Sequence, residues 1–195
     1  MALTLSGDNG ITFPDSSTQN SAPEAAAYEF VEGGDLTGTV AELVFDVDLN
    51  SYTYDFVMSG VTPASTTSQV PLWLASSNGG SSWITSGYYY AIMTSTSSGS
   101  YGDYGSAAAT YLRVTQAGTD NTEAGITGVL NISRGQLGGV MLQLSSVQER
   151  SGSATDNFNG ASYLKGSTTV NAIKAYWSSG SNWSGRYSIY RRKIA

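Results

Sequence analysis

Apolar and polar side chains alternate along much of this chain. The clearest stretch is residues 39–49, TVAELVFDVDL, which contains three acids on one side. The five apolar residues of the other side are Ala41, Leu43, Phe45, Val47 and Leu49. Because successive side chains of a strand point to opposite faces, this spacing predicts a strand with one buried face.

Similar patterns, separated by turns rich in Gly, Ser and Asn, continue to the C-terminus. Strands are predicted at residues 52–61, 69–75, 83–94, 108–115, 125–132, 140–147, 168–177 and 185–191. Residues 76–82, SSNGGSS, contain Asn-Gly, which is typical of tight turns between paired strands. The segments 69–75 and 83–94 are therefore predicted to form a hairpin. The last two strands are predicted to pair in the same way across 178–183.

Some segments depart from this pattern. Pro71 lacks a backbone N–H, which favours the edge of a sheet for its strand. Residues 95–106 and 151–162 are rich in Ser, Gly and Asp and are predicted to be loops. Residues 21–31, SAPEAAAYEFV, fit either a short helix or an extended arm, since a proline and a glutamate suit the first turn of a helix.

Eight to ten short strands at roughly even spacing are typical of two packed antiparallel sheets. We therefore expect an all-β fold, an antiparallel β-sandwich that is jelly-roll-like. The chain lacks the fixed repeat period of a parallel β-helix. Its 195 residues suit one domain, expected at 36–195, preceded by a short extended N-terminal arm or assembly segment at 1–35.

Composition excludes several classes of site. Gly, Ser and Thr make up 73 of the 195 residues, and the chain has neither Cys nor His. Disulfides, thiolate nucleophiles, Cys- or His-ligated metals and a Ser-His-Asp triad are all excluded. Phe, Trp and Tyr supply 11% of the residues, which argues against a disordered chain. No apolar run approaches the length of a transmembrane helix, and the N-terminus has no signal-peptide pattern, so we expect no membrane insertion.

Charge is divided unevenly between the two halves. Residues 1–112 hold 11 acids and no Lys or Arg, whereas residues 113–195 hold 9 basic residues and 4 acids. This division fits either a patchy surface or an oligomer in which the acidic half of one copy meets the basic half of another. The one basic cluster, Arg191, Arg192 and Lys193, lies at the C-terminus, so nucleic acid is not expected as a partner.

No catalytic residue, metal site or cofactor is predicted. The sequence from Asp46 to Asn50 resembles the start of a calcium loop, but Ser51 and Val57 stand where such a loop needs Gly and Glu. Four acids are candidates for a hydrolytic pair, though nothing singles out two of them: Asp46, Asp48, Asp55 and Asp103. Two lysines, Lys165 and Lys174, are expected on the solvated surface.

Aromatic residues gather around the two predicted hairpins and the loop at 95–106. Trp and Tyr give a large contact area at low entropic cost, and both suit recognition of sugars or proteins. The alternative is ordinary packing in the core, and if Tyr89 points inward then its two neighbours point outward. The candidate ligand-binding residues are Trp83, Tyr88, Tyr90, Tyr101, Tyr104 and Trp183.

Three segments resemble structural proteins of bacteriophage virions. Residues 6–22, SGDNGITFPDSSTQNSA, are similar to the G-I-x-F-P-D-G-S/T-x-Q segment of tail fibres, with Ser16 where Gly is frequent. Residues 54–91 are similar to a strand and hairpin of marine and cyanobacterial phage proteins. Residues 177–193, WSSGSNWSGRYSIYRRK, resemble their closing strand, with Arg191 where Gly is usual. Together the segments span about half of the chain in the expected order.

This resemblance implies a trimeric β-sandwich on the exterior of a phage particle, assembled in the host cytoplasm, which binds rather than catalyses. The leading expectation is a small tail-fibre or tail-tip protein that contacts other virion proteins and host-surface glycan. A capsid decoration protein at the symmetry axes and a separate carbohydrate-binding module are the alternatives. The expected assembly residues are Ile11, Phe13, Pro14, Tyr28, Phe30, Arg191, Arg192 and Lys193.

Overall fold

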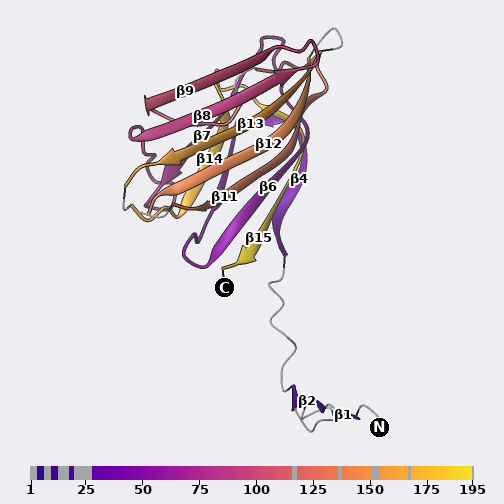
Figure 1. Cartoon of the computed structure of the whole chain (residues 1–195), viewed down its shortest axis with the longest axis vertical. Helices are drawn as coiled ribbons and strands as arrows, with labels where there is room; N and C mark the ends of the chain where they lie inside the picture. The colour runs from indigo at the N-terminus through magenta and orange to yellow at the C-terminus, as the bar shows by residue number, and fades with distance from the viewer. Residues whose placement is uncertain are drawn as a thin grey trace.

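In a computed structural model, two antiparallel sheets pack face to face (Figure 1). The structure describes residues 28–115, 118–135, 138–150, 154–166 and 168–194, with the backbone alone at positions 149, 150 and 154. It also describes the backbone of three short strands that form a small sheet of their own: β1 (Thr4–Ser6), β2 (Gly10–Thr12) and β3 (Thr18–Gln19). The described residues contain strands and turns and no helix, which confirms the expected all-β class.

The larger sheet of the sandwich has eight strands. In spatial order they are β4 (Glu29–Val40), β15 (Trp183–Lys193), β6 (Tyr52–Pro63), β11 (Gly125–Arg134), β12 (Val140–Arg150), β13 (Ala154–Leu164), β8 (Tyr88–Thr96) and β9 (Tyr101–Ala109). The smaller sheet has four strands. Their order is β10 (Leu112–Arg113), β7 (Pro71–Ser76), β14 (Ala172–Trp177) and β5 (Glu42–Asp46).

The order of the strands is that of a jelly roll. The small sheet runs β5-β14-β7-β10, and the large sheet runs from β6 through β11 to β13 and on to β8 and β9. The position next to β6, which a simple jelly roll fills with one strand, holds the meander of β11, β12 and β13. Strands β4 and β15 extend the sheet beyond β6. The expected jelly-roll-like sandwich is therefore confirmed, with twelve strands in its described part.

Consecutive strands cross between the sheets, so two predicted hairpins are wrong. Strand β7 belongs to the small sheet and β8 to the large one, and β14 and β15 are separated in the same way. The prediction that Pro71 marks an edge is also wrong, because β7 has partners on both sides. Pro71 is the first residue of β7, a position where a strand tolerates a missing N–H.

Two segments predicted as loops are strands. Strand β9 lies within the polar stretch 95–106 and beyond it, and β13 occupies most of 151–162. In β13 the polar residues Asn157 and Asn159 point to solvent, while Phe158 and Ser162 are buried. Buried and exposed positions do alternate in β13. The sequence does not show this as alternating apolar and polar residues, because Gly160 and Ser162 occupy inward positions.

Large aromatic side chains fill the space between the sheets. Trp177 and Trp183 are fully buried, with ring centroids 4.6 Å apart. Phe56 of β6 meets Trp73 of β7 edge-to-face at 5.0 Å, which joins the two sheets directly. Offset and edge-to-face pairs of this kind stabilise a core beyond the burial of their area.

The N-terminal arm and the acidic half are tied into the sandwich from Glu29 onward. Strand β4 begins at this residue and pairs with β15, so the predicted boundary between residues 35 and 36 falls inside a strand. Residues 29–31 are extended rather than helical, and residues 21–27 lie outside the described residues. No helix that the structure describes has the length and apolarity to cross a membrane.

Ion pairs join the acidic and basic halves within one chain. Arg186 bonds Asp35 and Arg191 bonds Glu29, each at 2.7 Å, and both pairs connect β15 to β4. Each lowers the cost of placing a charge on the sheet, although exposed pairs contribute little to stability.

Candidate functional site

At the β8–β9 edge, the large sheet extends beyond the small sheet that covers its inner face. The facing strand of the small sheet, β10, has only two residues and packs against β13 and β8. Beyond it, Ile92 and Phe158 form a buried cluster separate from the main core. The inner face of β9 therefore has no sheet above it, and a pocket of about 260 Å³ lies there.

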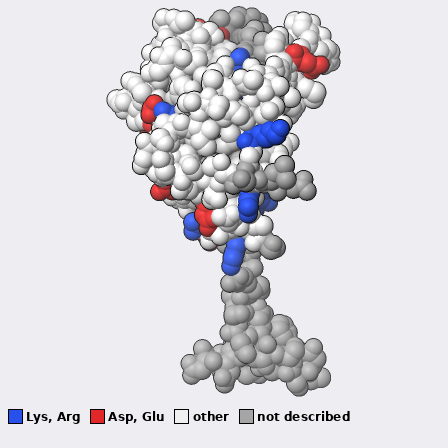
Figure 2. All heavy atoms as spheres, turned by 90° about the vertical axis from the view of Figure 1, so that its left-hand side faces the viewer, with Lys and Arg blue, Asp and Glu red and all other residues white. Residues whose placement is uncertain are grey.

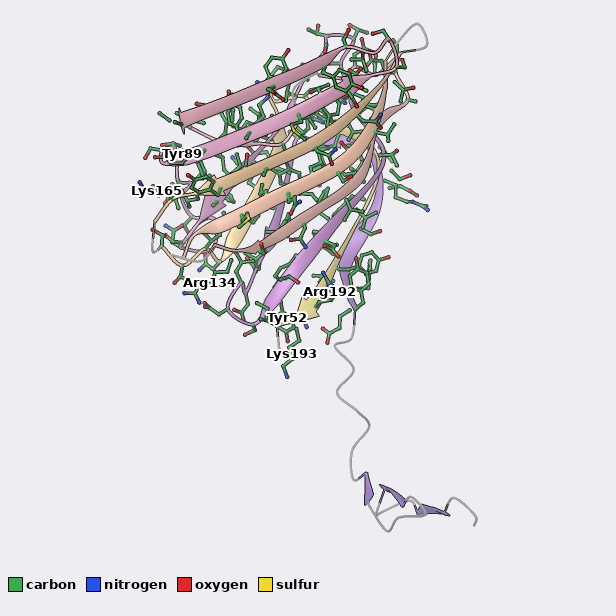
Figure 3. The ribbon with its side chains drawn as sticks, in the orientation of Figure 1. Tyr52, Tyr89, Arg134, Lys165, Arg192 and Lys193 are labelled. Atoms are coloured by element: carbon green, nitrogen blue, oxygen red, sulfur yellow. The ribbon has the colours of Figure 1, made fainter. Side chains whose placement is uncertain are left out.

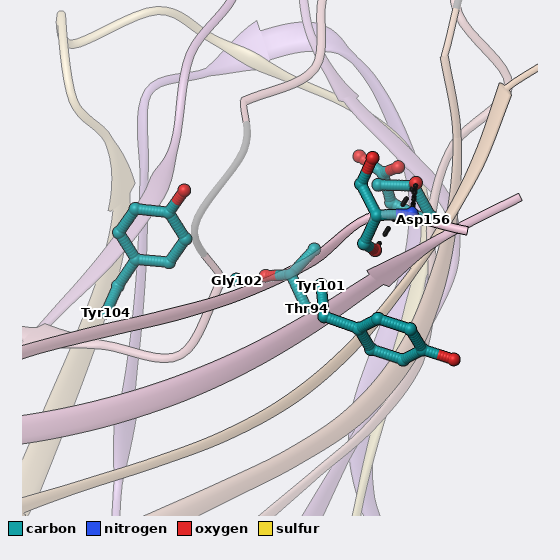
Figure 4. A pocket seen from close by; sticks show the side chains of 7 residues that line it. Thr94, Tyr101, Gly102, Tyr104 and Asp156 are labelled. Carbon is teal, nitrogen blue, oxygen red and sulfur yellow. Dashed lines mark hydrogen bonds between the residues drawn. The ribbon is translucent and has the colours of Figure 1, made fainter. Parts of the chain in front are cut away.

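Hydroxyl-bearing and aromatic residues line this pocket (Figure 4). They come from the ends of β8, β9 and β13 and the turn between β8 and β9: Thr94, Thr96, Ser100, Tyr101, Gly102, Tyr104 and Asp156. The register places Gly102 opposite Thr94 and Tyr104 opposite Ile92. Because directly paired residues point to the same face, both strands offer these positions to the pocket.

Tyr104 supplies the aromatic wall. Its ring lies so close to Gly102 that a Cβ added there would come within 2.9 Å of the ring atom Cε2. A larger residue at position 102 would make the ring shift, and the missing side chain of Gly102 also leaves open the space opposite Thr94. The ring of Tyr104 remains 46% exposed, so a bound molecule can reach it.

Thr94 presents a buried hydroxyl to the pocket. Only 7% of the residue is exposed, and Oγ1 has no hydrogen-bond partner among the described residues. A buried polar atom without a partner costs free energy. A ligand hydroxyl in the pocket would offset that cost. Substitution of Thr94 therefore tests ligand binding at this site most directly.

Other oxygen atoms lie around Thr94. The register pairs Asp156 with Thr96, and the carboxylate of Asp156 borders the pocket while being almost entirely buried. The hydroxyl of Thr96 accepts a hydrogen bond from the backbone N–H of Ser100 at 3.1 Å, which closes the turn from β8 to β9 (Figure 4). The pocket thus combines neutral hydroxyls, one acid and one exposed ring.

The structure brings together two of the six predicted ligand-binding residues and places a third nearby. Tyr101 and Tyr104 both line the pocket, although Figure 4 shows the ring of Tyr101 pointing away from that of Tyr104. Tyr101 is 86% exposed. Tyr90 is half-buried and packs on the small cluster of Ile92 and Phe158 under the β8–β9 edge.

Two of the predicted contact residues lie in the core instead, which corrects their expected exposure. Trp183 is fully buried against Trp177, because β15 begins at this residue rather than after it. Tyr88 is also fully buried; its hydroxyl donates to the carbonyl of Ile84 and accepts from the N–H of Ala75. Burial raises the pKa of Tyr88 to about 12.

Trp83 lies far from the pocket in the fold, on the outer face of the small sheet. Its ring lies 5.0 Å from Nζ of Lys174, which is also 5.4 Å from the ring of Tyr176 and bonds Glu42 at 2.8 Å. The expectation of a solvated Lys174 is wrong, because its side chain is only 12% exposed. The group stabilises this face through cation–π contacts.

The residues predicted for assembly gather only in part. Tyr28 stacks on Tyr190 at 4.8 Å, and Phe30 meets the same ring edge-to-face at 5.8 Å. Burial and the hydrogen bond to Asp55 raise the pKa of Tyr28 to about 12. For Ile11 the structure describes the backbone alone, in β2, while Phe13 and Pro14 lie outside the described residues.

The C-terminal basic residues have different surroundings. The guanidinium of Arg191 lies 4.3 Å from the centroid of the Tyr52 ring. Figure 3 shows Arg192 and Lys193 beside Tyr52 at the end of the sandwich where the chain finishes. Arg134 lies at the same end of the molecule in that view.

The four candidate acids are spread over several elements: Asp46 is the last residue of β5, Asp48 lies between β5 and β6, and the other two lie on β6 and β9. Asp48 accepts hydrogen bonds within its own turn, and the bond from Ser51 lowers its pKa. Asp55 lies on the outer face of β6, where it accepts hydrogen bonds from Asn131 at 2.9 Å and from Tyr28 at 2.8 Å. Asp103 lies on β9. The described residues contain no group of three or more acids placed to hold a metal ion.

A second feature is the outer face of the large sheet, which we define as the outward positions of β6, β11, β12, β13 and β8. Among the side chains described there, Asp55 is the only charged one. Figure 2 views the molecule from another side, where acidic and basic side chains lie scattered among uncharged ones. The exposed large apolar residues of the outer face are Met93, Val129, Met141, Val147 and Tyr163.

Sequence reasoning missed Thr94, Gly102 and Asp156. Thr94 lies in a strand of ordinary alternation, and Gly102 and Asp156 lie in segments predicted as loops. The one available signal was the pair of tyrosines in 95–106, which marked the correct turn.

No family model matches this chain, and neither curated proteins nor solved structures give a significant match.

Proposed function

We propose that this protein is a structural component of a bacteriophage virion, a small homotrimeric tail-fibre or tail-tip protein that binds the host surface. The proposal assigns it a role in adhesion and assembly, on the exterior of the particle, rather than in catalysis. The resemblance of three sequence segments to virion proteins motivates the assignment. The jelly-roll order supports it, because this architecture recurs in capsid proteins and lectins.

The observation that carries the proposal is the outer face of the large sheet. Five large apolar side chains are exposed there among polar ones, and apolar side chains that gather on one exposed face are typical of interaction surfaces. The chain has a formal net charge of −6, so identical copies repel one another over most of their surface. Among the side chains described on the outer face Asp55 is the single charged one, so repulsion between copies is low there.

Closed association around a threefold axis also explains how such a face is kept from aggregating. A strand-built face with exposed apolar side chains and few described charges invites open-ended association unless symmetry closes it. In the trimer we propose, the outer faces of the three copies turn toward the axis. The pocket opens on the other side of the large sheet and remains accessible.

The first prediction concerns the mass in solution. The full chain is expected to have about three times the 20.4 kDa chain mass at micromolar concentration, by light scattering or native mass spectrometry. Val129→Asp places a charge at the centre of the outer face and is expected to give monomers, since a buried unpaired charge is costly.

Val44→Asp is the matched control for this variant. Val44 is 49% exposed and Val129 is 42% exposed, but Val44 lies on the outer face of the small sheet. This control is expected to remain trimeric. A monomeric wild-type chain would overturn the trimer, and a trimeric Val129→Asp variant would place the contact elsewhere. Retention on purified capsids rather than on tails would favour a decoration protein.

A further inference from the structure

The pocket at the β8–β9 edge selects for a particular ligand chemistry. Its lining includes no lysine or arginine among the described residues. Phosphate, sulfate and carboxylate ligands need cationic partners, so the pocket disfavours them.

Hydroxyl groups of a sugar complement the polar lining. Each sugar hydroxyl both donates and accepts a hydrogen bond, as do Thr94, Thr96 and Ser100. The Oγ1 atom of Thr94 has no partner among the described residues, and a sugar hydroxyl would provide one. The carboxylate of Asp156 accepts hydrogen bonds from hydroxyl donors.

The exposed ring of Tyr104 complements the apolar side of a sugar. The ring lies in the space that a Cβ at position 102 would enter. An aromatic side chain gives a large contact area while losing little entropy on binding. The hydroxyls of the pocket thus complement the hydroxyl groups of a pyranose, and the Tyr104 ring complements its apolar side.

We propose that this pocket binds one pyranose unit of a neutral host-surface polysaccharide. The inference rests on the proposed function, for which it specifies the ligand and the residues that bind it. The size of the pocket supports a single sugar ring: its volume is about 260 Å³, below the roughly 300–1,000 Å³ of pockets for drug-sized ligands. Thr94 and Tyr104 are the residues on which binding depends most.

The test uses the full chain and saturation-transfer NMR with the methyl glycosides of glucose, galactose, mannose and N-acetylglucosamine at millimolar concentration. A glycan array of neutral polysaccharides extends the same measurement to longer ligands. At least one glycoside is expected to receive saturation from the protein, with its ring protons closest to Tyr104.

Two variants assign the binding to the pocket. Thr94→Val keeps the shape of the side chain and removes the hydroxyl, and it is expected to weaken binding about tenfold. Its melting temperature is expected to be unchanged or higher, since Oγ1 has no described partner to lose and valine suits a strand. Tyr104→Ala is expected to weaken binding by tenfold or more.

Tyr176→Ala is the control for Tyr104→Ala. Tyr176 is a partly exposed tyrosine on the outer face of the small sheet, outside both the pocket lining and the proposed trimer contact. This control is expected to retain binding. Silence toward all glycosides and the array would overturn the saccharide site, as would full binding by both pocket variants. The solution mass is measured separately, so failure here is distinguishable from failure of the trimer.

Discussion

The inner face of the large sheet has two regions that differ in what covers them. Over β6, β11 and β15 the small sheet lies directly above, and the space between holds fully buried aromatic residues such as Phe56 and Trp183. Over β8 and β9 the covering strand β10 is only two residues long. There the inner face holds Thr94, Asp156 and the exposed ring of Tyr104.

This contrast shows how a sandwich of unequal sheets acquires a pocket. Eight strands cannot all be covered by four, so part of the inner face must meet solvent. In that part the inward positions combine the buried apolar pair Ile92 and Phe158 with buried polar residues such as Thr94 and with the exposed side chain of Tyr104. The covered region determines stability, and the uncovered region is free to bind a ligand.

The largest expected difference between the covered and the uncovered region appears when one aromatic residue is truncated in each. Trp183→Ala is expected to lower the free energy of unfolding by about 3–5 kcal/mol, because it leaves a large cavity between the sheets. Tyr104→Ala is expected to cost less than about 1 kcal/mol, since its ring is half exposed. Urea unfolding at one fixed protein concentration measures both. Similar losses for the two variants would refute the division into regions.

A smaller effect is expected where the segment after β10 closes over the large sheet. A Cβ at Gly160 would collide with the carbonyl oxygen of Val114, so the backbone of β13 or of the segment after β10 must shift. Gly160→Ala is expected to cost about 1–3 kcal/mol in the same unfolding experiment. Gly34→Ala on β4, where a Cβ meets nothing within 4 Å, is the control and is expected to change little. Equal stability of the two variants would contradict the close approach.

The smallest of the three effects depends on pH. Burial raises the pKa of Tyr88 to about 12, above its ordinary value of 10.0, so the unfolded chain releases this proton at lower pH than the folded one. The resulting stability is complete below pH 10 and is lost as the pH rises toward 12. Tyr88→Phe is expected to cost about 1–2 kcal/mol at neutral pH through its two lost hydrogen bonds.

The alkaline part of the profile separates this pKa from the hydrogen bonds. Stability of Tyr88→Phe is expected to fall less steeply than that of the wild-type chain between pH 10 and 12, in chemical unfolding followed by circular dichroism. The twelve other tyrosines contribute equally to both proteins. Parallel profiles would show that burial leaves the Tyr88 hydroxyl unperturbed.

Much of the fold was predictable from local alternation. Residues 52–61, 125–132 and 140–147 form strands because their apolar residues occupy every second position. The pairing of strands was less predictable. Turn chemistry between β7 and β8 indicated a hairpin, yet the strands lie in different sheets, because burial of Trp73 and Tyr88 against both layers outweighs local pairing.

The candidate site was predictable only through its tyrosines. Tyr101 and Tyr104 stand out in a polar segment, whereas nothing local distinguishes Thr94 or Asp156 from other polar residues in strands. Asp156 is distant from the other pocket residues along the chain, and only the pairing of β13 with β8 brings it to the pocket. Local reasoning has no access to such a pairing, so the acid could not be assigned to the site in advance.

Composition and spacing were enough to establish the all-β class, the absence of thiol and imidazole chemistry and the division of charge between the two halves. These properties follow from residue counts and from alternation with a period of two, which act locally. Only the assembled fold established which strands pair, which aromatic residues are buried and where the large sheet extends beyond its partner. Such outcomes arise from contacts between residues far apart in the chain, whose free energy is gained only when both layers are in place.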